Sequence, residues 1–223
     1  PSTGVRGNDA PNGDGYGTAR IGIDGKTKST LVLGDGTKAT HAGFVSVDGE
    51  WLIHKDLYRT KPKGFIAGRL LFRDVVNISD FDGELQWVKR ADRREKRFNR
   101  GFEIRQITLG SSYTPPAVGE RAFANGDIIL DFTDGDVPNI PARSFGDWAT
   151  TNKVVIETTD PTQKFAVKVN SKNGVVTGTY TDSLRKKKIP FGGVIFEKQD
   201  ILTGHFIGTD NTGLFGILRN DLP

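Results

Sequence analysis

Residues 21–57 read IGIDGKTKSTLVLGDGTKATHAGFVSVDGEWLIHKDL, and this stretch decides the fold class. Asp-Gly dipeptides at 24–25, 35–36 and 48–49 divide it into short segments in which apolar and polar residues alternate. Such alternation is typical of β-strands with one buried face. Gly adopts positive φ without a Cβ clash, so an Asp-Gly pair between two strands predicts a hairpin turn. The stretch therefore predicts a series of β-hairpins.

The same pattern continues along the rest of the chain of 223 residues. Residues 164–169 alternate Lys with Phe and Val, and further strands are expected over 127–132, over 175–181 and, in three segments, between 188 and 218. The regular spacing of turns and strands is that of an up-and-down sheet. We therefore predict an all-β fold, an antiparallel meander that closes into a β-barrel, with at most one short helix near residues 90–100.

Several glycines lie inside these apolar strands, next to aromatic residues or two positions from them. Gly weakens a strand unless it forms a bend or admits a neighbouring ring, and strongly coiled barrel strands need such positions. This pattern favours a closed or highly curved sheet. The glycines are Gly68, Gly83, Gly178, Gly193, Gly204 and Gly208.

The beginning of the chain differs from the rest in composition. Residues 1–15 are rich in Gly, Pro, Asn and Asp and have no apolar period, so we expect a flexible leader there. Residues 16–223 are predicted to form a single barrel-like domain, which is large enough to fold without cross-links.

Two blocks of sequence recur at an offset of 110 residues. Residues 64–70 and 174–180 both read Gly, two apolar residues, a small residue, Gly, any residue and an apolar residue, and a later Phe and Gly recur at the same offset. One interpretation is a duplication with halves of about 16–110 and 120–223. The alternative is that β-hairpins reuse Gly and aromatic residues at strand spacing.

The composition excludes some classes of site. The chain has no Cys, which rules out disulfides, zinc–thiolate sites and thiol nucleophiles. The net charge of +4 is small, so nucleic acid is not an expected partner. No apolar run approaches the roughly 20 residues of a membrane helix, so no membrane span is expected. A Cys-free chain rich in Gly, Asp, Thr and Asn fits an exported bacterial protein.

Tryptophan and histidine supply the candidate ligand-binding residues. Trp148 lies in a segment rich in Gly and Asp, where we expect it to be exposed, so that its ring would stack on a sugar and Asp147 would accept a hydroxyl. Trp51 is a second candidate, although packing in the core explains a strand Trp equally well. His205 stands between Gly and Phe in a strand, where it would be structural or would line a cavity.

The densest run of positive charge is a candidate site for an anionic partner. Arg93, Arg94, Arg97 and Arg100 would contact phosphate groups or an anionic polysaccharide, or would form a solvated loop or helix face. No metal site or cofactor is predicted from the spacing of the three His residues. Acidic residues near 8–14 and 131–136 leave a surface calcium ion as an alternative to plain turn chemistry.

Nearly the whole chain, from about residue 16 to residue 218, resembles a β-rich C-terminal module of large exported proteins of planctomycete and verrucomicrobial type. The most specific segments are the Asp-Gly turn at 35–36, residues 112–116 (SYTPP) and residues 191–208 (FGGVIFEKQDILTGHFIG). The resemblance implies export and a surface or extracellular setting. It implies no reaction.

These observations predict a non-enzymatic, exported β-barrel module with a structural or adhesive role, whose partners would be cell-surface polysaccharide or neighbouring domains of a parent protein. One alternative is a carbohydrate- or small-ligand-binding module that uses a loop Trp or the barrel mouth. The second alternative is a polysaccharide hydrolase. The sequence shows no catalytic motif such as a G-x-S-x-G elbow or H-E-x-x-H, and its 27 acidic residues do not single out a catalytic pair.

Overall fold

The computed structural model describes residues 9–58, 63–123, 126–137, 140–158, 163–182 and 186–220. These residues form antiparallel β-strands and no helix, which confirms the all-β prediction. The strands are β1 (Tyr16–Ile21), β2 (Lys26–Val32), β3 (Lys38–Phe44), β4 (Glu50–Leu57), β5 (Gly64–Val75), β6 (Ser79–Lys89), β7 (Phe102–Gly110), β8 (Asp127–Thr133), β9 (Arg143–Trp148), β10 (Val154–Ile156), β11 (Lys164–Asn170), β12 (Val175–Asp182), β13 (Lys187–Phe196), β14 (Ile201–Ile207) and β15 (Thr212–Arg219).

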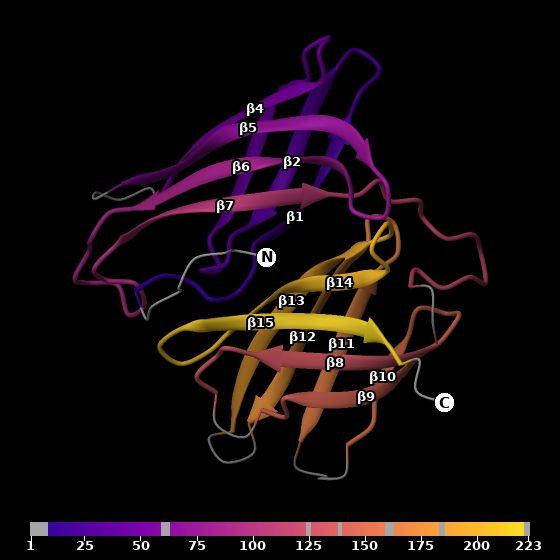
Figure 1. Cartoon of the computed structure of the whole chain (residues 1–223). Helices are drawn as coiled ribbons and strands as arrows, with labels where there is room; N and C mark the ends of the chain where they lie inside the picture. Colours follow the sequence, from indigo (N-terminus) through magenta and orange to yellow (C-terminus); the bar gives the residue numbers. More distant parts are fainter. Residues whose placement is uncertain are drawn as a thin grey trace.

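The N-terminal half consists of two sheets that follow each other along the chain. Strands β1–β3 form one sheet and β4–β7 the other, and a bridge between Val45 and Trp51 joins them at a corner. Figure 1 shows β1 and β2 crossing behind β4–β7 in the upper part of the molecule. The inner faces of the two sheets share one hydrophobic core, which contains Leu33, Trp51, Ile53, Leu70 and Trp87.

The Asp-Gly turns of this half form as predicted. Gly25, Gly36 and Gly49 have φ of 75°, 85° and 78°, the left-handed region that favours Gly. The Asp24 carboxylate accepts a hydrogen bond from the Lys26 backbone N–H at 3.1 Å, and that of Asp35 accepts one from the Thr37 N–H at 2.8 Å. These side-chain contacts stabilise the turns in addition to the Gly conformation.

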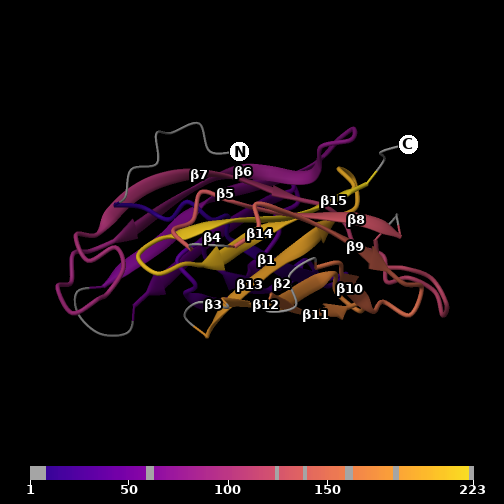
Figure 2. The same cartoon turned by 90° about the horizontal axis from the view of Figure 1, so that it is seen from below.

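The C-terminal half is a single, nearly closed sheet of eight strands. Its order is β10-β9-β8-β15-β14-β13-β12-β11, so consecutive strands pair and β15 returns to pair with β8. The two ends of this order, β10 and β11, lie beside each other. Figures 1 and 2 show β8, β9 and β15 on one wall and β11–β13 on the other. The prediction of a meander that closes into a barrel is confirmed for this half.

Aromatic side chains fill the interior of the barrel. The ring of Phe132 lies 5.4 Å from that of Phe191 and 5.2 Å from that of Phe215. Phe191 itself lies over Gly178 on the neighbouring strand, where an added Cβ would stand 2.2 Å from the Phe191 Cζ atom. The strand glycine at 178 therefore admits a neighbouring ring, as its position beside aromatic residues predicted.

Residues 10–14 join the two halves instead of forming part of a flexible leader. Ala10, Pro11 and Gly13 are buried, and the Gly13 N–H donates to the Thr212 hydroxyl at 3.4 Å. A Cβ on Gly13 would stand 2.3 Å from the His205 Cβ, so only Gly lets the segment pass so close to β14. The composition of this segment thus reflects close packing, and residues 1–8 of the predicted leader lie outside the described residues.

The segment predicted as a short helix or basic loop is a loop. Residues 90–101 connect β6 and β7 through turns, with Phe98 buried at φ 54° and its ring packed at 5.8 Å on that of Phe102. The Arg97 guanidinium donates to the Gly208 carbonyl oxygen at 3.2 Å, across to the C-terminal half. This second contact between the halves holds the loop against the turn that follows β14.

The two blocks at an offset of 110 fall on similar hairpins with different pairing. The first spans β5–β6 and the second β12–β13. Gly68 stands opposite Leu85, whereas Gly178 stands opposite Phe191 and not opposite Ile195, which the offset would require. The register is thus not repeated, and duplication stays a prediction.

Candidate functional site

A cleft of about 220 Å³ lies at one end of the N-terminal half. The Asp35–Gly36 turn, Tyr58 at the end of β4, Lys89 at the end of β6 and residues 95–98 line it. Tyr58 directly follows the last residue of β4 and has φ 59°, which turns the chain away from the sheet. Elements distant in the sequence therefore converge on this cleft.

Hydrogen bonds connect the polar groups of the cleft in series. The Trp87 indole N–H donates to the Tyr58 hydroxyl oxygen at 3.1 Å, and the Tyr58 hydroxyl donates to the Asp35 carboxylate at 2.8 Å. Burial, and next the nearby Asp35 charge, raise the pKa of Tyr58 far above its ordinary value. Tyr58 therefore stays protonated at physiological pH and acts as a hydrogen-bond donor to Asp35.

Lys89 neutralises the charge of Asp35 in this buried setting. The Lys89 Nζ atom lies 3.7 Å from the Asp35 carboxylate, and the two side chains are 8% and 2% exposed. Nζ also lies 4.7 Å from the centre of the Tyr58 ring and 5.9 Å from that of Phe98, which gives two cation–π contacts. The paired charges and the donor Tyr58 make this a polar core that supports the end of the sheet.

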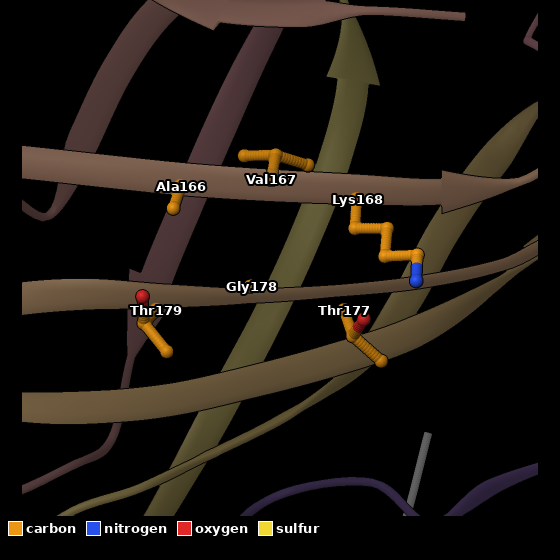
Figure 3. Close-up of a pocket in the computed structure, with 6 residues that line it drawn as sticks. All are labelled: Ala166, Val167, Lys168, Thr177, Gly178 and Thr179. Carbon is orange, nitrogen blue, oxygen red and sulfur yellow. The ribbon is translucent and has the colours of Figure 1, made fainter.

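A shallow hollow lies on the wall of the barrel formed by β11 and β12. Its volume is about 370 Å³, and its lining lacks aromatic rings. Figure 3 shows Lys168 pointing to the opposite side of β11 from Val167, as alternation along a strand requires. Polar atoms come from Lys168, Thr177 and Thr179, which suits weak contact with a polar surface rather than enclosure of a ligand.

Exposed apolar side chains lie at the free ends of two neighbouring hairpins. We define the hairpin-end patch as Ile23 in the β1–β2 turn and Val47 in the β3–β4 turn. Ile21 and Phe44, the strand residues beside these turns, face opposite sides of the β1–β3 sheet. All four are exposed, Phe44 by 62% and the two turn residues Ile23 and Val47 almost fully. The Val45 N–H donates to the Gly25 carbonyl oxygen at 2.9 Å, which joins the two ends. We therefore consider these two neighbouring hairpin ends as a candidate contact surface.

The expectation that Trp148 is exposed is wrong. Trp148 is the last residue of β9, is fully buried in the barrel core and stacks at 5.4 Å on Phe123. Its indole N–H donates to the Asn152 side-chain oxygen at 3.0 Å. A ring with no accessible surface offers no face to a sugar, so Trp148 is a core residue.

The other ligand candidates lie apart from Trp148. Asp147 precedes it on β9 and is exposed on the outer face of the barrel. Trp51 is 2% exposed in the core of the N-terminal half. His205 is buried where the halves meet, and its Nδ1 donates to the Asp14 carbonyl oxygen at 2.9 Å. The structure does not bring these residues together.

Three of the four arginines of the predicted anionic-partner patch have partners within the protein. Arg94 forms a bidentate contact with Asp92, Arg97 donates to backbone carbonyls, and Arg100 lies 3.8 Å from Asp9. Arg93 is exposed. Much of the positive charge of this loop is therefore engaged in contacts within the protein.

Acidic residues of the segments considered for calcium have contacts as well. Asp131 pairs with Arg143 at 2.9 Å, and Asp136 accepts from the Asp210 backbone N–H. Among the described residues, no group of three or more His, Asp or Glu side chains is placed to hold a metal ion.

Sequence reasoning missed Tyr58 and Lys89, which come from different strands and carry no motif. Asp35 belongs to a predicted turn, but nothing in that turn indicates an ion pair with a residue 54 positions later. A polar or charged residue at the inward position of a strand end, as Lys89 is on β6, is the signal that would have pointed to it.

Comparison with protein-family models, with curated proteins and with solved structures finds no match to this chain. The described part of the chain contains no helix with the length and apolar character needed to cross a membrane.

Proposed function

We propose that the chain is a non-enzymatic β-barrel module with an adhesive role in an exported surface or extracellular protein, acting through contacts between copies of the chain. The hairpin-end patch carries this proposal, because Ile23 and Val47 are almost fully exposed at the ends of ordered hairpins. Covering such side chains contributes about 25 cal/mol per Å² of apolar area removed from water.

Two further features support an adhesive role. The sheets that carry the patch share a packed hydrophobic core that includes Trp51 and Leu70, so the hairpins end on an ordered support. The patch is identical in every copy, so two copies related by a two-fold axis would each cover the patch of the other. Export rests on the absence of Cys and on the resemblance to modules of exported proteins.

Sedimentation velocity over a range of protein concentrations tests the proposal. The wild-type chain should self-associate, and the double variant Ile23→Asp, Val47→Asp should not, because a charge in the contact must be desolvated. Val118→Asp is the matched control, since Val118 is equally exposed but lies in the loop after β7. It should behave as the wild type does.

A glycan array and insoluble polysaccharides test the ligand-binding alternative with the same proteins. If the wild-type chain does not self-associate but binds a glycan specifically, and the double variant binds that glycan as well, the adhesive role is contradicted and carbohydrate binding is favoured. A chain that stays monomeric and binds no glycan would also contradict it.

A further inference from the structure

Lys89 carries a buried ammonium group that makes no hydrogen bond within the described part of the chain. Its side chain is 8% exposed, and its Nζ atom lies 3.7 Å from the Asp35 carboxylate, beyond hydrogen-bond distance. No other described residue accepts a hydrogen bond from this atom. An ammonium has three N–H donors, and a buried charged donor without an acceptor is strongly destabilised. An acceptor is therefore expected beside Lys89.

The Asp35 carboxylate is engaged by other donors. One of its oxygens accepts a hydrogen bond from the Tyr58 hydroxyl at 2.8 Å, and the other accepts one from the Thr37 N–H at 2.8 Å. The separation of 3.7 Å joins Lys89 Nζ to the oxygen that Tyr58 already contacts. Asp35 thus balances the charge of Lys89, while the Lys89 donors stay available to a ligand.

The cleft that Lys89 lines has room for a small ligand. Its volume of about 220 Å³ exceeds several times the roughly 30 Å³ that one water molecule takes up in the liquid. It is smaller than the roughly 300–1,000 Å³ of pockets that hold drug-sized molecules. Glu95 and Lys96 also line it and are exposed, so the cleft opens to solvent.

Two aromatic residues that line the cleft have backbone conformations that are rare for such side chains. The φ angles of Tyr58 and Phe98 are 59° and 54°. A bulky residue with positive φ is strained, and such residues are frequent at ligand-binding sites, where the surrounding structure enforces them. Both rings lie against Lys89 Nζ, at 4.7 and 5.9 Å. The strained positions therefore coincide with the buried ammonium.

The cleft lies where the two halves of the molecule meet, which fixes its lining. Arg97 lines it and donates to the Gly208 carbonyl oxygen at 3.2 Å. On its other side, a Cβ added to Gly36 would stand 2.7 Å from Ile207 Cδ1, so the Asp35–Gly36 turn packs closely on the end of β14. The site is thus formed before a ligand arrives, as is usual for small-molecule sites.

The charges around the cleft select the chemistry of the ligand. Three positive and two negative side chains line it, namely Lys89, Lys96, Arg97, Asp35 and Glu95. One further negative charge brings their total to zero. Lys96 also lies 4.0 Å from Asp210, a contact between exposed side chains that is weak in water. A carboxylate carries one charge and two acceptor oxygens, and its hydrogen bonds with an ammonium are stronger than those between neutral groups.

We propose that this cleft binds the carboxylate of a small organic acid, whose oxygens accept hydrogen bonds from the Lys89 ammonium, while Lys96 and Arg97 supply further positive charge. The carboxylate belongs either to a simple free acid or to a sugar acid. The site is independent of the hairpin-end patch and of the adhesive role.

Nuclear magnetic resonance of the ¹⁵N-labelled chain tests the site, with acetate and galacturonate as the two probes. The Trp87 indole N–H donates to the Tyr58 hydroxyl, so its resonance should shift in a saturable way. The indole resonances of Trp51, near the other end of β4, and of Trp148, in the barrel, should stay in place. Tighter binding of acetate would identify a simple acid as the ligand, and tighter binding of galacturonate would identify a sugar acid. Acetamide, which has a similar shape without the charge, should bind at least tenfold more weakly.

Two variants and a control connect the shift to Lys89. The double variant Asp35→Asn, Lys89→Met removes both charges of the buried pair, so neither is left unpaired, and it should weaken acetate binding at least tenfold. Lys96→Gln removes an exposed charge of the cleft and should weaken binding about two- to threefold, because solvent screens that charge. Lys168→Gln removes an exposed charge on β11 of the barrel, outside the cleft, and should have no effect.

Two results would overturn the proposal. If the Trp87 resonance does not move with either acid, the cleft holds water only. If the double variant binds acetate as tightly as the wild type, or Lys168→Gln weakens binding as much as Lys96→Gln, the acid binds elsewhere on the protein. Lys96→Gln and Lys168→Gln change only exposed side chains, so their comparison decides the matter even if the double variant fails to fold.

Discussion

Gly178→Ala should destabilise the protein because the added methyl group would clash with the Phe191 ring and with the Ala166 carbonyl oxygen. The φ of Gly178 is not in the left-handed region, so the backbone itself accepts Ala. The added Cβ would stand 2.2 Å from Phe191 Cζ, 2.4 Å from Phe191 Cε2 and 2.6 Å from the Ala166 carbonyl oxygen. The Phe191 ring cannot move away freely, since the Phe215 ring lies 4.6 Å from it. Overpacking of this kind costs about 1–3 kcal/mol.

A double-mutant cycle measured by urea unfolding tests this explanation. Phe191→Leu removes the ring atoms that clash, so Gly178→Ala should cost less in that background by at least about 1 kcal/mol. Some cost should remain because the Ala166 carbonyl oxygen does not move away. If the effects of the two substitutions on the free energy of unfolding add within about 0.5 kcal/mol, Phe191 does not pack over Gly178 as the structure describes.

The remaining predictions concern the contacts between the halves and the buried ion pair. Burial lowers the pKa of His205 below 6.5, so the stabilisation from neutral His205 is present above that pH and is lost as the pH falls through the folded-state pKa. His205→Gln should flatten the pH dependence of the unfolding free energy in this window, and an unchanged slope would contradict the burial of His205. Lys89→Met should lower the free energy of unfolding by about 3–5 kcal/mol because it leaves the Asp35 charge unpaired. The further change Asp35→Asn should recover part of this loss, as measured by chemical denaturation. If Lys89→Met leaves the free energy of unfolding unchanged, the buried pair is refuted. Arg97→Ala should destabilise the protein by about 1 kcal/mol in thermal unfolding, because the contact with the Gly208 carbonyl oxygen is lost. The control Arg93→Ala should cost under about 0.5 kcal/mol. Equal effects of the two substitutions would show that the loop does not hold the halves together.

The turns could be predicted from the sequence because they depend on only a few neighbouring residues. Asp24-Gly25 and Asp35-Gly36 form turns, since positive φ and a nearby carboxylate are properties of a few residues. Asp82-Gly83 is the same dipeptide, yet it lies inside strand β6 and forms no turn. A Cβ on Gly83 would stand 2.2 Å from the Arg69 carbonyl oxygen, so this glycine serves a close approach between strands. The dipeptide alone does not distinguish these two uses.

The exposure of side chains could not be predicted in the same way because it depends on partners distant in sequence. Trp148 follows Gly and Asp and resembles a loop residue, yet pairing of β9 with β8 and β10 turns its ring into the barrel. The small inward residues Ser144 and Gly146 that precede it at alternate positions are the local signal of a strand.

Cross-linking of a single introduced thiol tests most directly whether hairpin ends of two copies meet. The chain has no Cys, so Ile23→Cys provides a unique reactive group at the hairpin-end patch. Under mild oxidation this variant should form a covalent dimer faster than Val118→Cys, whose side chain is equally exposed elsewhere. Equal and slow dimerisation of both variants would contradict the adhesive role of the hairpin ends.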